Sequence, residues 1–257
     1  HATGDWRAEL LWTESKNGYP KLVTHMANVI KILQHHPDWR GKIVFDEFRD
    51  RVTVKDAPWS KHGLPPSTSD QWQDEDGSKL SSWMRQEFHQ EGFSPCVNAC
   101  DAAVDVVARD RVFHPVRQYL LPLKWDGKPR IEHLAKALGT KCDTYATNVL
   151  RWWLISAVAR VMRPGCKADH VLILEGKTGI GKSKALAILA GQWFSDTPII
   201  LGNKDAYQQI RGKWIVELAE LVSLTRASSD AAKAFFSSMR DDYRRAYGKR
   251  EVEQKRQ

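Results

Sequence analysis

VLILEGKTGIGKS, at residues 171–183, places four consecutive apolar residues directly before a loop of three glycines, two lysines and a serine. The run HVLILE at 170–175 is typical of a short strand that is buried on both faces. Behind the loop, KSKALAILAG at 182–191 consists of good helix formers and ends at a glycine. The order of strand, glycine loop and helix predicts an α/β fold.

The loop itself, GKTGIGKS at residues 176–183, has the full spacing G-x-x-x-x-G-K-[ST] of a phosphate-binding loop. Its glycines permit positive φ angles, so that backbone N–H groups can surround an anion. Lys182 can reach the β- and γ-phosphates of a nucleotide, the Ser183 hydroxyl can ligate Mg²⁺, and the following helix directs its N-terminal dipole at the anion. The alternative is an ordinary glycine turn with an incidental lysine. We expect the nucleotide to be bound by Gly176, Lys177, Thr178, Gly179, Ile180, Gly181, Lys182 and Ser183.

Such a loop needs an acidic partner on a neighbouring strand, which holds Mg²⁺ or polarises the attacking water. The segment GKWIVELAEL at 212–221 offers Glu217 at the end of an apolar run, and Glu220 three residues later. The β-branched Ile215 and Val216 favour a strand, whereas an amphipathic helix with both glutamates exposed is the alternative. We expect Ser183 and Glu217 to be the metal ligands. Lys182, Glu217 and Glu220 are the candidate catalytic residues, and which glutamate activates water stays open.

The 257 residues are enough for two domains, and we place the boundary near residue 115. Residues 1–114 form an accessory region that we expect to be mainly helical, with two short strands in GKIVFDEF and RVTVKD. Residues 115–257 are expected to form the nucleotide-binding domain with a helical lead-in. Within it, YATNVLRWWLISAVARVM at 145–162 is apolar over most of its surface, which predicts a buried helix.

A net charge of +8 and a pI near 9.3 favour an acidic partner, with nucleic acid first, although a basic surface without any polyanion is the alternative. Neither a signal peptide nor a membrane span is visible, and we expect no membrane partner. Four irregularly spaced cysteines fit a reducing compartment, so the expected location is cytoplasmic.

The C-terminal segment, residues 233–257, carries eight Lys/Arg against four Asp/Glu. Its YGKRE sequence predicts a turn between two arms, with Lys249 and Arg250 near the tip. A basic hairpin of this kind can bind the phosphate backbone of a single strand without reading its sequence. The alternative is a charged, solvated surface.

Four motifs of the chain resemble those of the virulence-associated E family of phage and genomic-island proteins, and they occur in the family's order. This family is related to superfamily 3 helicases and viral primase-helicases. The resemblance covers about residues 110–257. The region before it is a weaker match, similar to the helical and winged-helix-like segments that precede the motor in such proteins. The motifs are HPVRQYLLPLKWDGKPRIEHL, VLILEGKTGIGKS, GKWIVELAEL and KAFFSSMRDDYRRAYGKR.

The resemblance implies an AAA+-related P-loop ATPase that assembles into a ring, usually a hexamer, around DNA. ATP with Mg²⁺ would lie between subunits, with Lys182 and Ser183 on one side, and Glu217 or Glu220 would take the Walker B role. Lys249 and Arg250 would contact a single strand. The chain ends before the family's sensor residue and arginine finger, so we expect an ATPase core that is incomplete at its C-terminal end and hydrolyses ATP poorly.

The expected function is therefore that of an ATP-dependent DNA helicase or translocase subunit for replicating a phage or mobile element. Two alternatives remain: a P-loop kinase of small molecules, and a non-hydrolysing DNA-binding remnant. Strand-stimulated hydrolysis of ATP separates the first function from the other two.

Overall fold

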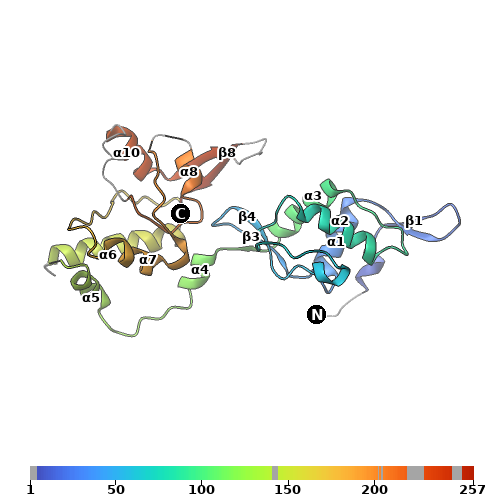
Figure 1. Ribbon diagram of the computed structural model, residues 1–257, viewed down its shortest axis with the longest axis horizontal. Helices are drawn as coiled ribbons and strands as arrows, with labels where there is room; N and C mark the ends of the chain where they lie inside the picture. Colours follow the sequence, from blue (N-terminus) through green and yellow to red (C-terminus); the bar gives the residue numbers. More distant parts are fainter. Residues whose placement is uncertain (1–4, 141–143, 202, 204, 219–228, 245–250) are drawn as a thin grey trace. The chain divides into compact units, whose positions relative to one another are not determined.

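The computed structural model describes residues 5–140, 144–201, 203, 205–218, 229–244 and 251–257 (Figure 1). The chain divides into two compact units, His1–His114 and Pro115–Gln257. Each unit combines helices with small sheets, which is an α/β composition in the broad sense. None of the described helices is both long and apolar enough to cross a membrane.

The first unit contains a hairpin, a three-stranded sheet and three α-helices within its described residues. The hairpin strands β1 and β2 are antiparallel, and the sheet has the order β4-β3-β5, with β3 antiparallel to β4 and parallel to β5. The two strands predicted in GKIVFDEF and RVTVKD are confirmed as β3 and β4. The elements are η1 (Trp6–Glu9), β1 (Trp12–Glu14), β2 (Pro20–Leu22), α1 (Met26–His35), β3 (Ile43–Asp46), β4 (Arg51–Val54), η2 (Trp59–His62), α2 (Asp76–Glu87), α3 (Val97–Arg109) and β5 (Val112–Phe113).

The core of this unit lies where α3 packs against α1, α2 and the three-stranded sheet. Helix α1 contributes Val29, Ile32 and Leu33, whose spacing puts them on one helix face. Trp39 and Trp83 are fully buried beside them, with ring centroids 5.6 Å apart. Burying each such apolar side chain contributes about 1.5–3 kcal/mol, so this cluster stabilises the unit as a whole.

The second unit begins with a helical lead-in and continues into the glycine loop. Helix α6 contacts both α4 and α5, and α7 contacts the short parallel strands β6 and β7. The elements are α4 (Pro115–Leu120), α5 (Arg130–Ala137), α6 (Thr144–Met162), α7 (Lys182–Ala190), η3 (Gly191–Trp193), β6 (Phe194–Ser195), α8 (Asp205–Gln209), β7 (Ile215–Val216), α10 (Ser229–Ser237), β8 (Arg240–Arg244) and β9 (Glu251–Lys255).

Aromatic side chains connect the lead-in to the strands of this unit. The rings of Tyr119, Trp193 and Trp214 lie within 6.5 Å of one another, centroid to centroid. The indole N–H of Trp214 donates to the Ala157 carbonyl of α6 over 3.0 Å. Because Trp214 directly precedes β7, this bond fixes the strand against α6.

The prediction that the long helix is buried is wrong for most of its length. Of the residues of α6, only Leu150, Arg160 and Val161 are buried, whereas Trp152 and Ile155 are more than half exposed. The apolar surface runs around the helix, but α4, α5 and the Trp214 side cover only part of it. The apolar composition shows that the helix could be buried, but its described neighbours leave most of it accessible to solvent.

The predicted buried strand at 170–175 is also absent from the structure. No regular strand forms there, and the side chains of Val171 and Ile173 are about half exposed. A strand needs a neighbour that exchanges hydrogen bonds with it. Among the described residues, β6 and β7 pair with each other, and no strand pairs with this segment.

The two arms predicted around the C-terminal turn are confirmed as the antiparallel strands β8 and β9, in the register Arg240↔Lys255 to Arg244↔Glu251. Arg256, just after β9, is buried and donates to the Asp241 carboxylate and to the Phe235 carbonyl of α10. Its guanidinium also lies 4.6 Å from the centroid of the Phe235 ring. These contacts fix the hairpin to α10.

Candidate functional site

The glycine loop at 176–183 leads into α7 and contains two backbone conformations that only glycine adopts without strain. Gly179 has φ +84° and Gly181 has φ +94°, and Gly181 is the N-cap of α7. The loop is exposed apart from Lys182, which is half-buried, so a ligand can reach its backbone. The helix predicted after the loop is confirmed and ends at Ala190, before Gly191.

Lys182 is folded back over its own loop. Its ammonium donates to the carbonyl of Gly176 over 2.9 Å and to that of Lys177 over 3.0 Å. Three of the predicted loop residues thus meet at one cation, while Thr178 and Ile180 lie exposed at the rim. An anion that replaced these two carbonyl oxygens would bind to the Lys182 ammonium, which already lies over the loop.

Glu217 follows β7, so the strand interpretation of its segment is confirmed and the helix interpretation is excluded. Its backbone N–H donates to the Ser195 carbonyl of β6 over 2.8 Å, which extends the parallel pairing to Glu217 itself. The Ser183 hydroxyl donates to Glu217 Oε1 over 2.7 Å. Two residues that lie 34 positions apart therefore meet where the loop becomes α7.

The second carboxylate oxygen of Glu217 has no such partner. Oε2 is inaccessible to solvent and makes no hydrogen bond to any described residue. A buried anionic oxygen without a partner costs about 1–3 kcal/mol or more, unless a ligand completes it. A carboxylate and a hydroxyl are hard oxygen ligands of the kind that Mg²⁺ prefers, so Ser183 and Glu217 fit this metal.

Three further predicted site residues, Glu220, Lys249 and Arg250, lie outside the described residues. Their roles stay predictions.

The comparisons with known proteins concern the second unit. The family model of the virulence-associated protein E-like domain matches residues 120–257, more than half of the chain. The chain belongs to this family. A search of curated proteins finds no match. The resemblance drawn from the four motifs is thereby confirmed, and membership suggests a protein associated with phages or mobile genetic elements.

Within the virulence-associated protein E-like domain, no role for Asp241 could be predicted from residue spacing. The structure pairs it with Arg256, whose Nε lies 2.7 Å from Asp241 Oδ1. Both side chains are buried. Because removing one partner of such a pair leaves an uncompensated buried charge, Asp241 stabilises the hairpin and is not a free site residue.

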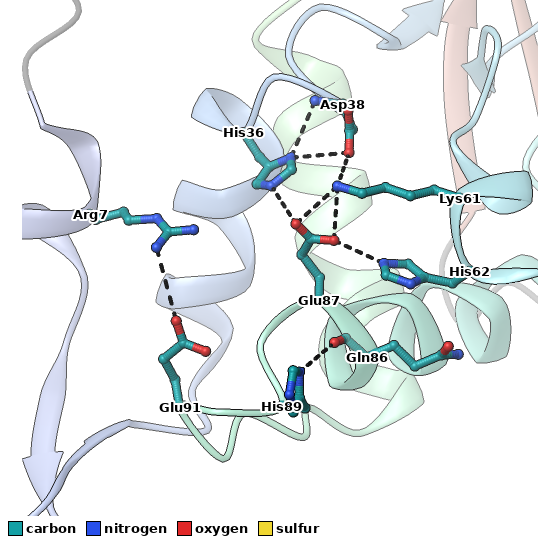
Figure 2. A network of polar contacts seen from close by, with 9 residues as sticks. All are labelled: Arg7, His36, Asp38, Lys61, His62, Gln86, Glu87, His89 and Glu91. Carbon is teal, nitrogen blue, oxygen red and sulfur yellow. Dashed lines mark hydrogen bonds and ion pairs between the residues drawn. The ribbon is translucent and has the colours of Figure 1, made fainter.

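A cluster of charged residues in the first unit also escaped the sequence analysis (Figure 2). The Lys61 ammonium lies between two carboxylates, 2.7 Å from Asp38 Oδ2 and 2.9 Å from Glu87 Oε2. His62 Nε2 is 2.9 Å from Glu87 Oε2, and His36 Nε2 is 3.4 Å from Glu87 Oε1. Since an ammonium occupies the centre and no described group of carboxylates, histidines and cysteines can hold a metal, we interpret the cluster as structural.

The contacts within this cluster and its burial shift the pKa values of its members. The hydrogen bond from Lys61 lowers the pKa of Asp38 and correspondingly raises the pKa of Lys61. Burial acts to raise the pKa of Glu87, but hydrogen bonds from Lys61 and His62 outweigh it, and the pKa of Glu87 is lowered. Burial lowers the pKa of His36, whose Nδ1 accepts from the Asp38 N–H over 3.2 Å. His36 is therefore neutral near pH 7.

Proposed function

We propose that this chain is the ATP-binding part of a helicase-type DNA motor that serves the replication of a phage or mobile element. The observation that carries the proposal is the 2.7 Å hydrogen bond from Ser183 to Glu217. An ordinary glycine turn gives no reason for these two distant residues to meet at the start of a helix. A nucleotide site does, because a hydroxyl and an acidic side chain hold Mg²⁺ beside the phosphates in P-loop proteins.

The proposal gives Lys182, Ser183 and Glu217 separate tasks. When ATP binds, the Lys182 ammonium exchanges the carbonyl oxygens of Gly176 and Lys177 for phosphate oxygens. The N-terminus of α7 adds the positive end of its dipole. Ser183 and Glu217 would hold Mg²⁺, and the ion would supply neutralisation of the phosphate charge. Glu217, or Glu220 outside the described residues, orients the attacking water.

The charge distribution supports DNA as the polyanion partner. Residues 115–257 carry 25 Lys/Arg against 14 Asp/Glu, whereas residues 1–114 carry 14 against 17. The positive excess is therefore confined to the unit that holds the loop, and binding of single-stranded DNA through Lys249 and Arg250 is part of the proposal. So is assembly into a ring, a hexamer by family resemblance, with ATP between subunits.

The test is ATP hydrolysis by the whole chain, with and without single-stranded DNA, beside Lys182→Ala. DNA-stimulated turnover that the substitution abolishes is the expected result. Transfer of phosphate to a small-molecule acceptor would instead identify a kinase. Binding of DNA without any binding of ATP would contradict the motor function.

A further inference from the structure

The connector between α4 and α5 (Figure 1) carries a tryptophan that is exposed to solvent. Trp125 is 81% exposed, the largest exposed fraction among the large apolar side chains that the structure describes. Leu121 and Leu123 of the same connector are more than half exposed. Leaving an indole in water forgoes a large gain in burial free energy, so its position calls for a physical reason.

Several interactions hold this tryptophan in place at a tight turn. The Arg130 guanidinium makes a bidentate ion pair with the Asp126 carboxylate, at 2.5 and 2.6 Å. Asp126 Oδ1 also accepts from the Lys128 backbone N–H, and Gly127 takes φ +83° between them. The Trp125 indole N–H donates to the Lys128 carbonyl over 3.3 Å. The turn is thus built from its own residues and orients the ring without burying it.

The turn that carries Trp125 has more cationic than anionic residues. Arg130 neutralises Asp126, and the pKa of Asp126 falls to about 2 mainly through that hydrogen bond. Lys124 directly precedes Trp125 in the chain and Lys128 follows it by three residues, and neither has an ion-pair partner among the described residues. With its N–H bonded inside the turn, the indole offers a partner its exposed π-face, on a stretch of chain that also carries these two lysines.

We propose that this turn is a binding site for single-stranded nucleic acid, in which an unpaired base stacks on Trp125 and Lys124 and Lys128 contact the flanking phosphates. Aromatic faces beside lysines provide the two interactions that such strands use. A duplex fits poorly, because its bases are stacked on one another. A protein partner fits less well, because lysine is depleted at protein interfaces. The site is separate from the phosphate loop and needs no ATP.

The experiment measures binding of a short fluorescein-labelled oligothymidylate to the whole chain by anisotropy, without nucleotide. Trp125→Ala should raise Kd at least about fivefold, since the loss of one stacked base weakens binding by at least about this factor. Trp125→Phe should restore most of the affinity. Lys124→Ala with Lys128→Ala should flatten the dependence of Kd on salt, by about 0.7 in log–log slope per lost phosphate contact. Tyr145→Ala is the control, because Tyr145 is 77% exposed in the same unit but lies in α6.

Unchanged affinity in Trp125→Ala would overturn the proposal, as would an equal loss in Tyr145→Ala. Equal weakening of a blunt duplex by Trp125→Ala would overturn stacking on an unpaired base. Lys182→Ala should bind the oligothymidylate like the wild type. Failure of the phosphate-loop proposal would therefore leave this result intact, and failure of this site would leave ATP binding by the wild type intact.

Discussion

Replacing Glu217 with alanine separates a functional carboxylate from a structural one. The substitution removes the hydrogen bond from Ser183, which contributes about 1.5–3 kcal/mol for an ionised acceptor. It also removes the buried Oε2, whose missing partner costs about 1–3 kcal/mol. Ser183 is exposed, so water can satisfy its hydroxyl. The two effects offset each other, and we expect the free energy of unfolding to change by less than about 1 kcal/mol.

Binding of the nucleotide should respond differently. In the wild type, the affinity for a fluorescent ATP analogue should rise when Mg²⁺ is added, because Ser183 and Glu217 complete its coordination. In Glu217→Ala this gain should shrink at least about tenfold, while binding without metal stays as in the wild type. Titrations with and without Mg²⁺ measure both quantities, and urea denaturation measures stability.

Glu175→Ala is the matched control, because Glu175 is an exposed carboxylate directly before the same loop. It should leave both the stability and the effect of Mg²⁺ unchanged. A loss of more than about 3 kcal/mol in Glu217→Ala would show that the carboxylate is structural. An unchanged effect of Mg²⁺ would refute its role as a metal ligand.

Two further predictions concern the first unit. His36 is buried neutral with a lowered pKa, so below its ordinary value of 6.5 the unfolded chain binds the proton more readily, and stability falls as pH falls. In His36→Gln, the melting temperature should decline less between pH 7 and 5; parallel curves would contradict this. A Cβ at Gly77 would overlap the Asp101 carboxylate, which accepts from Trp72 over 3.0 Å. Gly77→Ala should therefore lower stability to urea by about 1–3 kcal/mol, and an equal or higher midpoint would show that Asp101 can move away.

Local patterns predicted the parts of this protein that depend on neighbours in sequence. The glycine loop, α7 and the strand before Glu217 follow from residue types that are adjacent in the chain. The contact between Ser183 and Glu217 could be expected because a parallel pair brings the end of β7 beside the loop.

The sequence was misleading where a structure depends on partners elsewhere. The run at 170–175 has the composition of a buried strand, but pairing requires a second strand beside it. The apolar residues of α6 likewise show that the helix could be buried, but they do not indicate which other elements would cover it. The cluster around Glu87 joins residues from positions 36 to 87 at no fixed spacing, so no pattern announces it. The exposure of the Trp125 ring could not be predicted either, because it depends on which of the described residues pack nearby.

The most direct test of the central claim is calorimetric binding of ATP with Mg²⁺ to the wild type, to Lys182→Ala and to Lys184→Ala. Lys184 lies two residues further along α7 and is exposed, so it controls for the loss of one positive charge. We predict that the wild type and Lys184→Ala bind ATP alike and that Lys182→Ala does not bind, with all three chains equally folded. Equal binding by Lys182→Ala, or no binding by the wild type, would contradict the assignment of residues 176–183 as a nucleotide site.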